Sequence, residues 1–151
     1  MKCVLYAEDE PDDVFFMERA FKRNETDARL VTVQHGGEAI SYLAGESPFD
    51  DRKKYPLPHL ILLDLKMPIM DGFDVLKWIR TSPTVSSIPV VVLTSSGNET
   101  DKSRAAMLGA NGYLIKAGQP EEMEQMIKVF QDYWLKHDHL SDESRPPGRM
   151  G

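Results

Sequence analysis

Residues 60–68 have the sequence Leu60-Ile61-Leu62-Leu63-Asp64-Leu65-Lys66-Met67-Pro68. The four aliphatic residues have the length and composition of a strand that is buried on both faces. Asp64 follows at once, which predicts a carboxylate at the C-terminal tip of that strand, where open α/β sheets place their ligand sites. Because an unpaired buried carboxylate is costly, we expect Asp64 to have polar or charged partners at the same edge.

Three other apolar segments also end in side chains that can carry chemistry. They are residues 2–7 before Glu8 and Asp9, residues 90–93 before Thr94, and residues 113–115 before Lys116. The carboxyl ends of parallel strands meet at one edge of a sheet, so we expect these groups to lie in one neighbourhood. The sequence therefore predicts a site of acids, one hydroxyl and one amine.

Strand-like and helix-like segments alternate along the chain. Strands are predicted at residues 2–7, 29–34, 60–63, 88–94 and 112–116, and helices at 11–23, 38–44, 73–82, 99–108 and 120–137. Residues 45–58 are rich in Pro, Gly and charges, which predicts a long exposed loop. The alternation predicts one α/β domain over residues 1–140, a single doubly wound five-stranded parallel sheet with five helices, followed by a disordered tail at 141–151.

The composition of the chain limits the classes of function that it can have. The chain has 151 residues, enough for one domain with a core, and its net charge of -6 argues against a nucleic-acid partner. The single cysteine, Cys3, is expected to be a buried hydrophobe in a reducing compartment. No apolar stretch reaches membrane-span length, so we expect a cytoplasmic protein that binds no membrane.

The predicted cluster suits a hard divalent cation. Carboxylates held close together repel one another unless a cation joins them, and Mg²⁺ favours oxygen ligands. Asp9 and Asp64 are the natural direct ligands, Glu8 can act through water, and the backbone carbonyl of Lys66 can complete the set. One carboxylate can then act as a nucleophile towards a phosphoryl donor, with Lys116 and Thr94 each holding an oxygen of the transferred group.

Four motifs together resemble the receiver domain of two-component response regulators. They are Glu8-Asp9, Asp64-Leu65-Lys66-Met67-Pro68 with Met70-Asp71-Gly72, Thr94-Ser95, and Tyr113-Leu114-Ile115-Lys116. The resemblance covers residues 2–137 and extends to the stand-alone, CheY-like receivers of phytochrome-type histidine kinases, which share the long loop before the third strand and an aromatic-rich last helix.

The resemblance implies a function for each of these residues. It implies that Asp64 accepts a phosphoryl group from a sensor histidine kinase, that Glu8, Asp9 and Asp64 hold Mg²⁺ with the Lys66 carbonyl, and that Lys116 binds the phosphoryl group. Thr94 and Tyr113 match the pair that reports phosphorylation, and Lys66 and Ser96 match positions that tune phosphoryl-group lifetime. Such a receiver catalyses its own phosphorylation and dephosphorylation and has no separate enzymatic output.

Two departures and two alternatives stay open at this point. Ala117 follows Lys116 where most receivers have proline, which leaves the geometry of that peptide open, and Glu8 replaces a common aspartate. A Mg²⁺-dependent phosphohydrolase with an aspartyl nucleophile usually carries a second Asp two residues later, where this chain has Lys66. A degenerate receiver that acts only as a scaffold is the other alternative. A homodimer or kinase-docking surface on the fifth strand and last helix is a further hypothesis.

Overall fold

Five parallel strands form one sheet in the order β2-β1-β3-β4-β5. The computed structural model describes residues 2–23, 28–116, 125–126 and 128. The strands are β1 Cys3–Ala7, β2 Arg29–Val33, β3 Leu60–Leu63, β4 Val90–Thr94 and β5 Gly112–Ile115. Within that part of the chain the helices are α1 Pro11–Arg23, α2 Gly36–Ala44, α3 Gly72–Thr81 and α4 Glu99–Met107. The predicted doubly wound α/β fold is confirmed.

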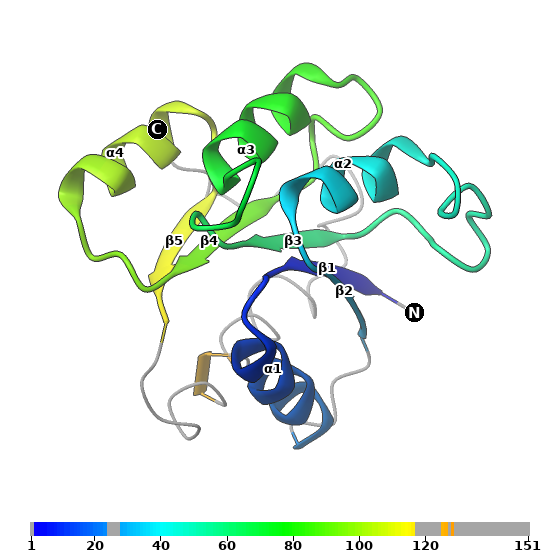
Figure 1. The fold of residues 1–151 in the computed structure, drawn as a ribbon, viewed down its shortest axis with the longest axis horizontal. Helices are drawn as coiled ribbons and strands as arrows, with labels where there is room; N and C mark the ends of the chain where they lie inside the picture. Colours follow the sequence, from blue (N-terminus) through cyan, green and yellow to red (C-terminus); the bar gives the residue numbers. More distant parts are fainter. Residues whose placement is uncertain (1, 24–27, 117–124, 127, 129–151) are drawn as a thin grey trace.

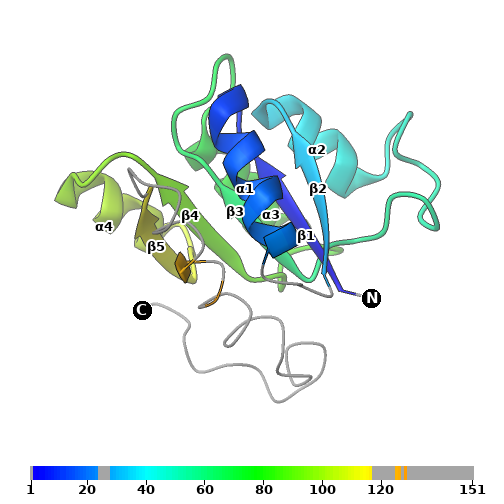
Figure 2. The same ribbon diagram turned by 90° about the horizontal axis from the view of Figure 1, so that it is seen from below.

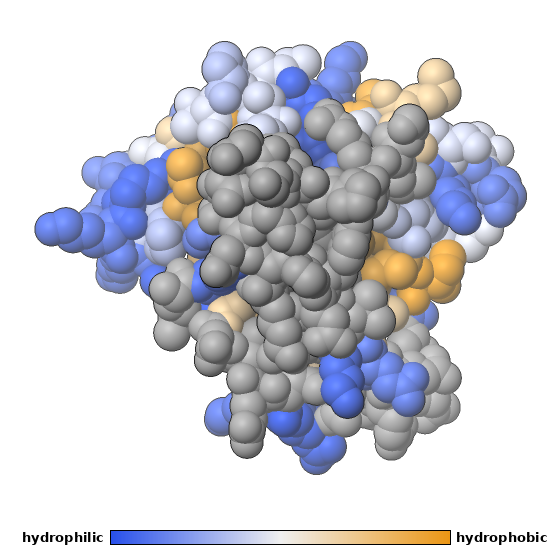
Figure 3. All heavy atoms as spheres, turned by 180° about the vertical axis from the view of Figure 1, so that it is seen from behind, coloured by the Kyte–Doolittle hydropathy of each residue, from blue (hydrophilic) through white to orange (hydrophobic). Residues whose placement is uncertain are grey.

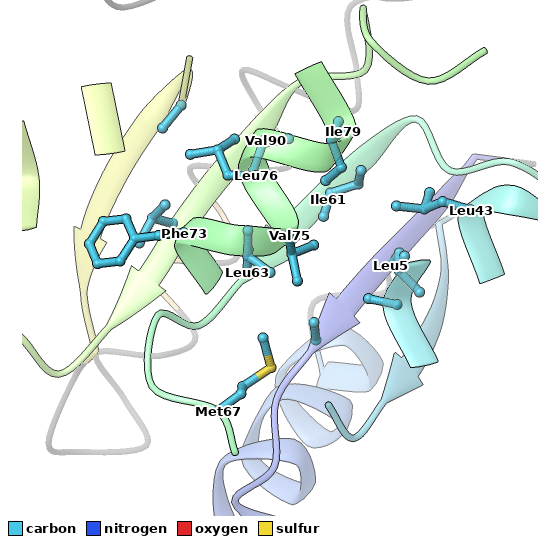
Figure 4. Close-up of a cluster of buried hydrophobic side chains, with 14 of the residues drawn as sticks. Leu5, Leu43, Ile61, Leu63, Met67, Phe73, Val75, Leu76, Ile79 and Val90 are labelled. Atoms are coloured by element: carbon cyan, nitrogen blue, oxygen red, sulfur yellow. The ribbon is translucent and has the colours of Figure 1, made fainter. Parts of the chain in front are cut away.

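The helices cover both faces of the sheet, α1 on one and α2, α3 and α4 on the other (Figures 1 and 2). Alternate residues of each central strand point to opposite faces, as the pleat requires. Leu5, Ile61 and Leu63 pack under α2 and α3 (Figure 4), whereas Tyr6 and Leu62 pack under α1. Every residue of β1, β3 and β4 is buried, so the prediction of strands enclosed on both sides is confirmed.

Side-chain caps explain where three helices begin. The side chains of His35, Asp71 and Asn98 accept backbone N–H groups from the first turns of α2, α3 and α4. Each side chain satisfies a donor that has no partner inside its helix. The predicted cap at Asn98 is confirmed, and α2 begins at Gly36, two residues before the predicted start, because His35 is its cap.

The loop between α2 and β3 is less exposed than predicted. Phe49, Tyr55 and Leu57 are partly buried against the core, and the rings of Phe49 and Tyr55 contact Tyr42 at centroid distances of 5.2 and 6.0 Å. The Arg52 guanidinium donates to the carbonyl oxygens of Tyr42, Leu43 and Tyr55. Aromatic contacts and this one cation fix a segment whose Pro, Gly and charges predicted an exposed loop.

Most of the predicted last helix and all of the predicted tail lie outside the described residues. Residues 125, 126 and 128 are helical, and Met126 packs against the core on the α1 side of the sheet. None of the helices in the described ranges is long and apolar enough to cross a membrane. On the face seen in Figure 3, hydrophobic side chains form separate groups among hydrophilic ones.

Candidate phosphoryl-acceptor and metal site

The carboxyl ends of β1 and β3 lie side by side and carry the acids. The backbone N–H of Asp64 donates to the carbonyl oxygen of Ala7 at 3.2 Å, so the ladder between the two strands continues to Asp64. Glu8 and Asp64 are almost fully buried, at 1% and 3% exposure, and Asp9 is exposed. One ligand oxygen from each of the three lies within 4.8 Å of the others. The predicted clustering of these acids is observed.

The loop after β3 is held tightly against Asp64. The backbone N–H of Gly72 donates to the carbonyl oxygen of Leu65 at 3.0 Å. A Cβ atom at Gly72 would collide with the backbone of Asp64 and Leu65, so only glycine allows α3 to begin this close to Asp64. The Met70-Asp71-Gly72 turn therefore fixes the backbone that carries Asp64.

Lys116 brings the fifth strand into the same site. Its backbone N–H donates to the carbonyl oxygen of Thr94 at 2.7 Å, which extends the β4–β5 ladder by one residue. Its ammonium nitrogen lies 2.6 Å from Glu8 Oε1 and 3.4 Å from Asp64 Oδ2. The amine that the sequence predicted beside the acids is observed there, and it contacts the Asp64 carboxylate.

Asp13 also contacts Lys116, a contact that was not predicted from the sequence. Its Oδ2 atom accepts from Lys116 Nζ at 2.7 Å. Asp13 stands in the first turn of α1, where an acid is explained by its interaction with the helix dipole. No local signal in the sequence selects Asp13 rather than its neighbour Asp12.

Burial and charge shift the ionisation of the site. Burial raises the pKa of Glu8 to about 7, and the nearby Asp64 adds to this, although Lys116 opposes it. Burial works against the charged form of Lys116, but its hydrogen bonds to Asp13 and Glu8 outweigh this, and its pKa is raised above the ordinary value. The Tyr6 hydroxyl donates to Glu8 Oε1 at 3.1 Å, which leaves the buried carboxylate with a neutral donor as well.

A hollow of about 480 Å³ opens above these groups. It is lined by Glu8, Asp9, Glu10, Asp13, Asp64, Lys66, Ser95 and Lys116. The Lys66 side chain is exposed, and its backbone N–H donates to Asp64 Oδ1 at 3.4 Å. The Lys66 carbonyl as a metal ligand stays a prediction. The buried carboxylate oxygens are hard donors of the kind that Mg²⁺ prefers, so the residues fit that ion.

Thr94 and Tyr113 are joined through one residue. Thr94 is fully buried, its Oγ1 accepts the Ser96 backbone N–H at 3.4 Å, and Ser95 rather than Thr94 lines the hollow among the described residues. The Tyr113 hydroxyl donates to the Ser96 carbonyl oxygen at 2.8 Å. Ser96 Oγ in turn donates to Asp101 Oδ2 at 2.8 Å. The predicted switch residues thus contact the same short segment after β4.

Two sequence hypotheses fall partly or wholly outside the described residues. Ala117, and with it the geometry of the Lys116–Ala117 peptide, lies beyond them. The predicted dimer or docking surface is described on its strand side, where Ile115 is 47% exposed, but on its helix side only at residues 125, 126 and 128. Both stay predictions.

Comparison with known proteins gives a consistent result. The response regulator receiver domain family matches residues 4–128. Response regulator Rcp1 of Synechocystis sp. is 33% identical over 135 residues, which cover 89% of this chain and 90% of that protein.

Two solved structures place these similarities in three dimensions. The phosphorylated cyanobacterial phytochrome response regulator RcpA is 35% identical with a TM-score of 0.83, covering 89% of this chain and 94% of that one. The Mn²⁺-bound form of Rcp1 is 33% identical with a TM-score of 0.80, covering 90% and 96%. The acidic hollow found here therefore occurs in a fold whose solved relatives include a phosphorylated and a metal-bound form.

Proposed function

The chain belongs to the response regulator receiver domain family, and on that premise we propose that it is a signalling switch phosphorylated on Asp64. The observation that carries this proposal is the contact between Lys116 Nζ and Asp64 Oδ2, at 3.4 Å, beside the Glu8 and Asp9 carboxylates. A buried carboxylate close to an amine and to two other acids is suited to phosphoryl transfer, which depends on positioning and charge neutralisation.

In the proposed reaction, an Asp64 carboxylate oxygen attacks the phosphorus atom of a phosphohistidine. The new O–P bond forms as the P–N bond breaks, and the imidazole nitrogen keeps the electron pair of the broken bond. Glu8, Asp9 and Asp64 would hold Mg²⁺, which supplies positive charge to the phosphoryl oxygens when bound. Lys116 holds a phosphoryl oxygen, and its raised pKa keeps it protonated for that role.

The output is proposed to pass through Thr94 and Tyr113. A phosphoryl group on Asp64 adds strong acceptors, which draw the Thr94 hydroxyl towards the hollow. The distance of 3.4 Å from the Ser96 backbone nitrogen to Thr94 Oγ1 is long for a hydrogen bond, so little free energy is lost when this contact breaks. The Tyr113 hydroxyl donates a hydrogen bond to the carbonyl oxygen of Ser96. A shift of the segment after β4 would therefore also move Tyr113, which lies on β5.

The phosphoryl donor is proposed to be a sensor histidine kinase of the phytochrome type. The support is the similarity to RcpA and Rcp1, of which the former is a phytochrome response regulator. A homodimer through β5 and the last helix is the proposed target of the output, together with altered partner binding.

The test of the acceptor is intact-mass spectrometry after incubation with acetyl phosphate and Mg²⁺. We expect a single acid-stable, alkali-labile phosphoryl adduct that is absent in Asp64→Asn and in the presence of a chelator. Asp74→Asn removes an exposed acid from α3 and is the matched control, which should be phosphorylated like the unaltered protein. A folded protein that forms no adduct would contradict the proposal and favour a protein-binding scaffold.

The phosphohydrolase alternative has a distinct outcome in the same assay. A hydrolase would consume phosphomonoesters in many turnovers without retaining an adduct. The position two residues after Asp64 is occupied by exposed Lys66, which is no general acid of the required kind. We therefore expect no turnover of phosphomonoester substrates.

A further inference from the structure

Lys116 has a third carboxylate partner whose role the proposed function does not define. Its ammonium lies 2.7 Å from Asp13 and 2.6 Å from Glu8, but 3.4 Å from Asp64. The amine is thus closer to two other acids than to the residue that would carry the phosphoryl group. A phosphoryl oxygen on Asp64 would compete with these two carboxylates for the ammonium.

A bound metal ion would affect the contacts of Asp13 and of Glu8 with Lys116 differently. Among the described residues, Glu8 belongs to the set whose ligand atoms lie within 4.8 Å of one another, and Asp13 does not. A cation bound by that set would draw the Glu8 carboxylate away from the ammonium. Asp13 would keep its contact with Lys116, because its carboxylate stands on α1 outside the set.

We propose that Asp13 is a positioning residue that competes with the phosphoryl group for the Lys116 ammonium, an inference that rests on the proposed function. Its side chain is 27% exposed and that of Lys116 12%, so the pair is only partly screened by solvent. Asp13 adds negative charge to the acidic hollow, which favours the metal, and it holds the amine back from the phosphoryl oxygens, which disfavours the phosphoryl group.

Asp13 is thus expected to favour metal binding and to disfavour binding of the phosphoryl group, so the test measures the two affinities separately. In Asp13→Asn, affinity for beryllofluoride, a phosphoryl analogue, measured by calorimetry at saturating Mg²⁺, should rise roughly fivefold, the order of one partly buried charged hydrogen bond. Affinity for Mg²⁺ alone, measured by an NMR titration, should fall about twofold. A variant that was merely misfolded would lose affinity for both probes.

Asp12→Asn is the matched control, because Asp12 is an exposed acid in the same first turn of α1. It removes the same charge from the helix end and should change beryllofluoride affinity by less than about twofold. A double-mutant cycle with Lys116→Met shows whether Asp13 acts through the amine. In the Lys116→Met background, we expect Asp13→Asn to have little remaining effect.

Each of the following results would overturn the inference. Weaker beryllofluoride binding in Asp13→Asn would mean that Asp13 orients the amine for the phosphoryl group instead of competing for it. An unchanged affinity, or an equal gain in the Lys116→Met background, would mean that Asp13 does not act through Lys116. If the unaltered protein binds no beryllofluoride, the proposed function itself fails, a result distinct from the other two.

Discussion

Two cations of this domain, Lys116 and Arg80, are both surrounded by oxygen atoms, yet their surroundings differ in kind. Lys116 contacts three carboxylates. The Arg80 guanidinium donates to neutral acceptors, the backbone carbonyl oxygens of Ser86, Ile88 and Gly109 and the side-chain oxygen of Asn111. Neutral acceptors carry no net charge that another ion could compensate. A group of carboxylates does, and it can therefore bind a different cation in place of the amine.

The two arrangements occupy opposite ends of the sheet. Arg80 joins the end of α3 to the segment that enters β4 and to the turn between α4 and β5, where buried Asn111 also accepts the Val90 N–H at 2.9 Å. Lys116 lies at the carboxyl ends of the strands, beside the hollow. One end of the sheet is thus closed by fixed hydrogen bonds, and the other keeps an excess of negative charge.

The largest effect on stability is expected at Arg80. Arg80→Met keeps an apolar stem but leaves the Ile88 and Asn111 acceptors without this donor, which should lower the free energy of unfolding by about 3 kcal/mol. Urea denaturation measures the change, and Mg²⁺ should not restore it. Lys77→Ala, an exposed position on the same helix, is the control and should cost less than about 0.5 kcal/mol. A small loss of unfolding free energy in Arg80→Met would mean that water replaces the hydrogen bonds of the guanidinium.

Whether the sequence predicts the contacts of Lys116 and Arg80 depends on how far apart in the chain the contacting residues lie. The strands and the caps at Asp71 and Asn98 follow from local patterns, and the acids at strand ends follow from the rule that parallel strands share a carboxyl edge. The Asp13 contact joins residues 103 positions apart, and no local pattern selects Asp13 over Asp12 as the partner. Arg80 has the sequence appearance of a helix-terminal charge, and its acceptors on Ser86, Ile88 and Gly109 are backbone atoms that carry no residue-type signal.

A smaller and conditional effect is expected at Lys116. Lys116→Met leaves the Glu8, Asp13 and Asp64 carboxylates without this cation, so the metal-free protein should lose about 2 kcal/mol of unfolding free energy. Mg²⁺ should raise the Tm of this variant more than that of the unaltered protein, because the divalent ion replaces the amine and is no longer repelled by it. Equal stabilisation of both proteins would show that Lys116 and the metal do not share the acids.

The most gradual effect is expected from pH. The pKa of Glu8 is raised from 4.5 in the unfolded chain to about 7 by burial. The folded protein therefore binds an additional proton between these values, so the stability contributed by Glu8 is complete below about pH 4.5 and is lost as pH rises through about 7. Metal binding needs the deprotonated carboxylate, so Mg²⁺ should bind more weakly as pH falls through 7 and should release protons on binding. Calorimetry in buffers of different ionisation enthalpy counts those protons, and Glu8→Gln should abolish their release. Release that persists in Glu8→Gln would assign the proton to another group of the hollow.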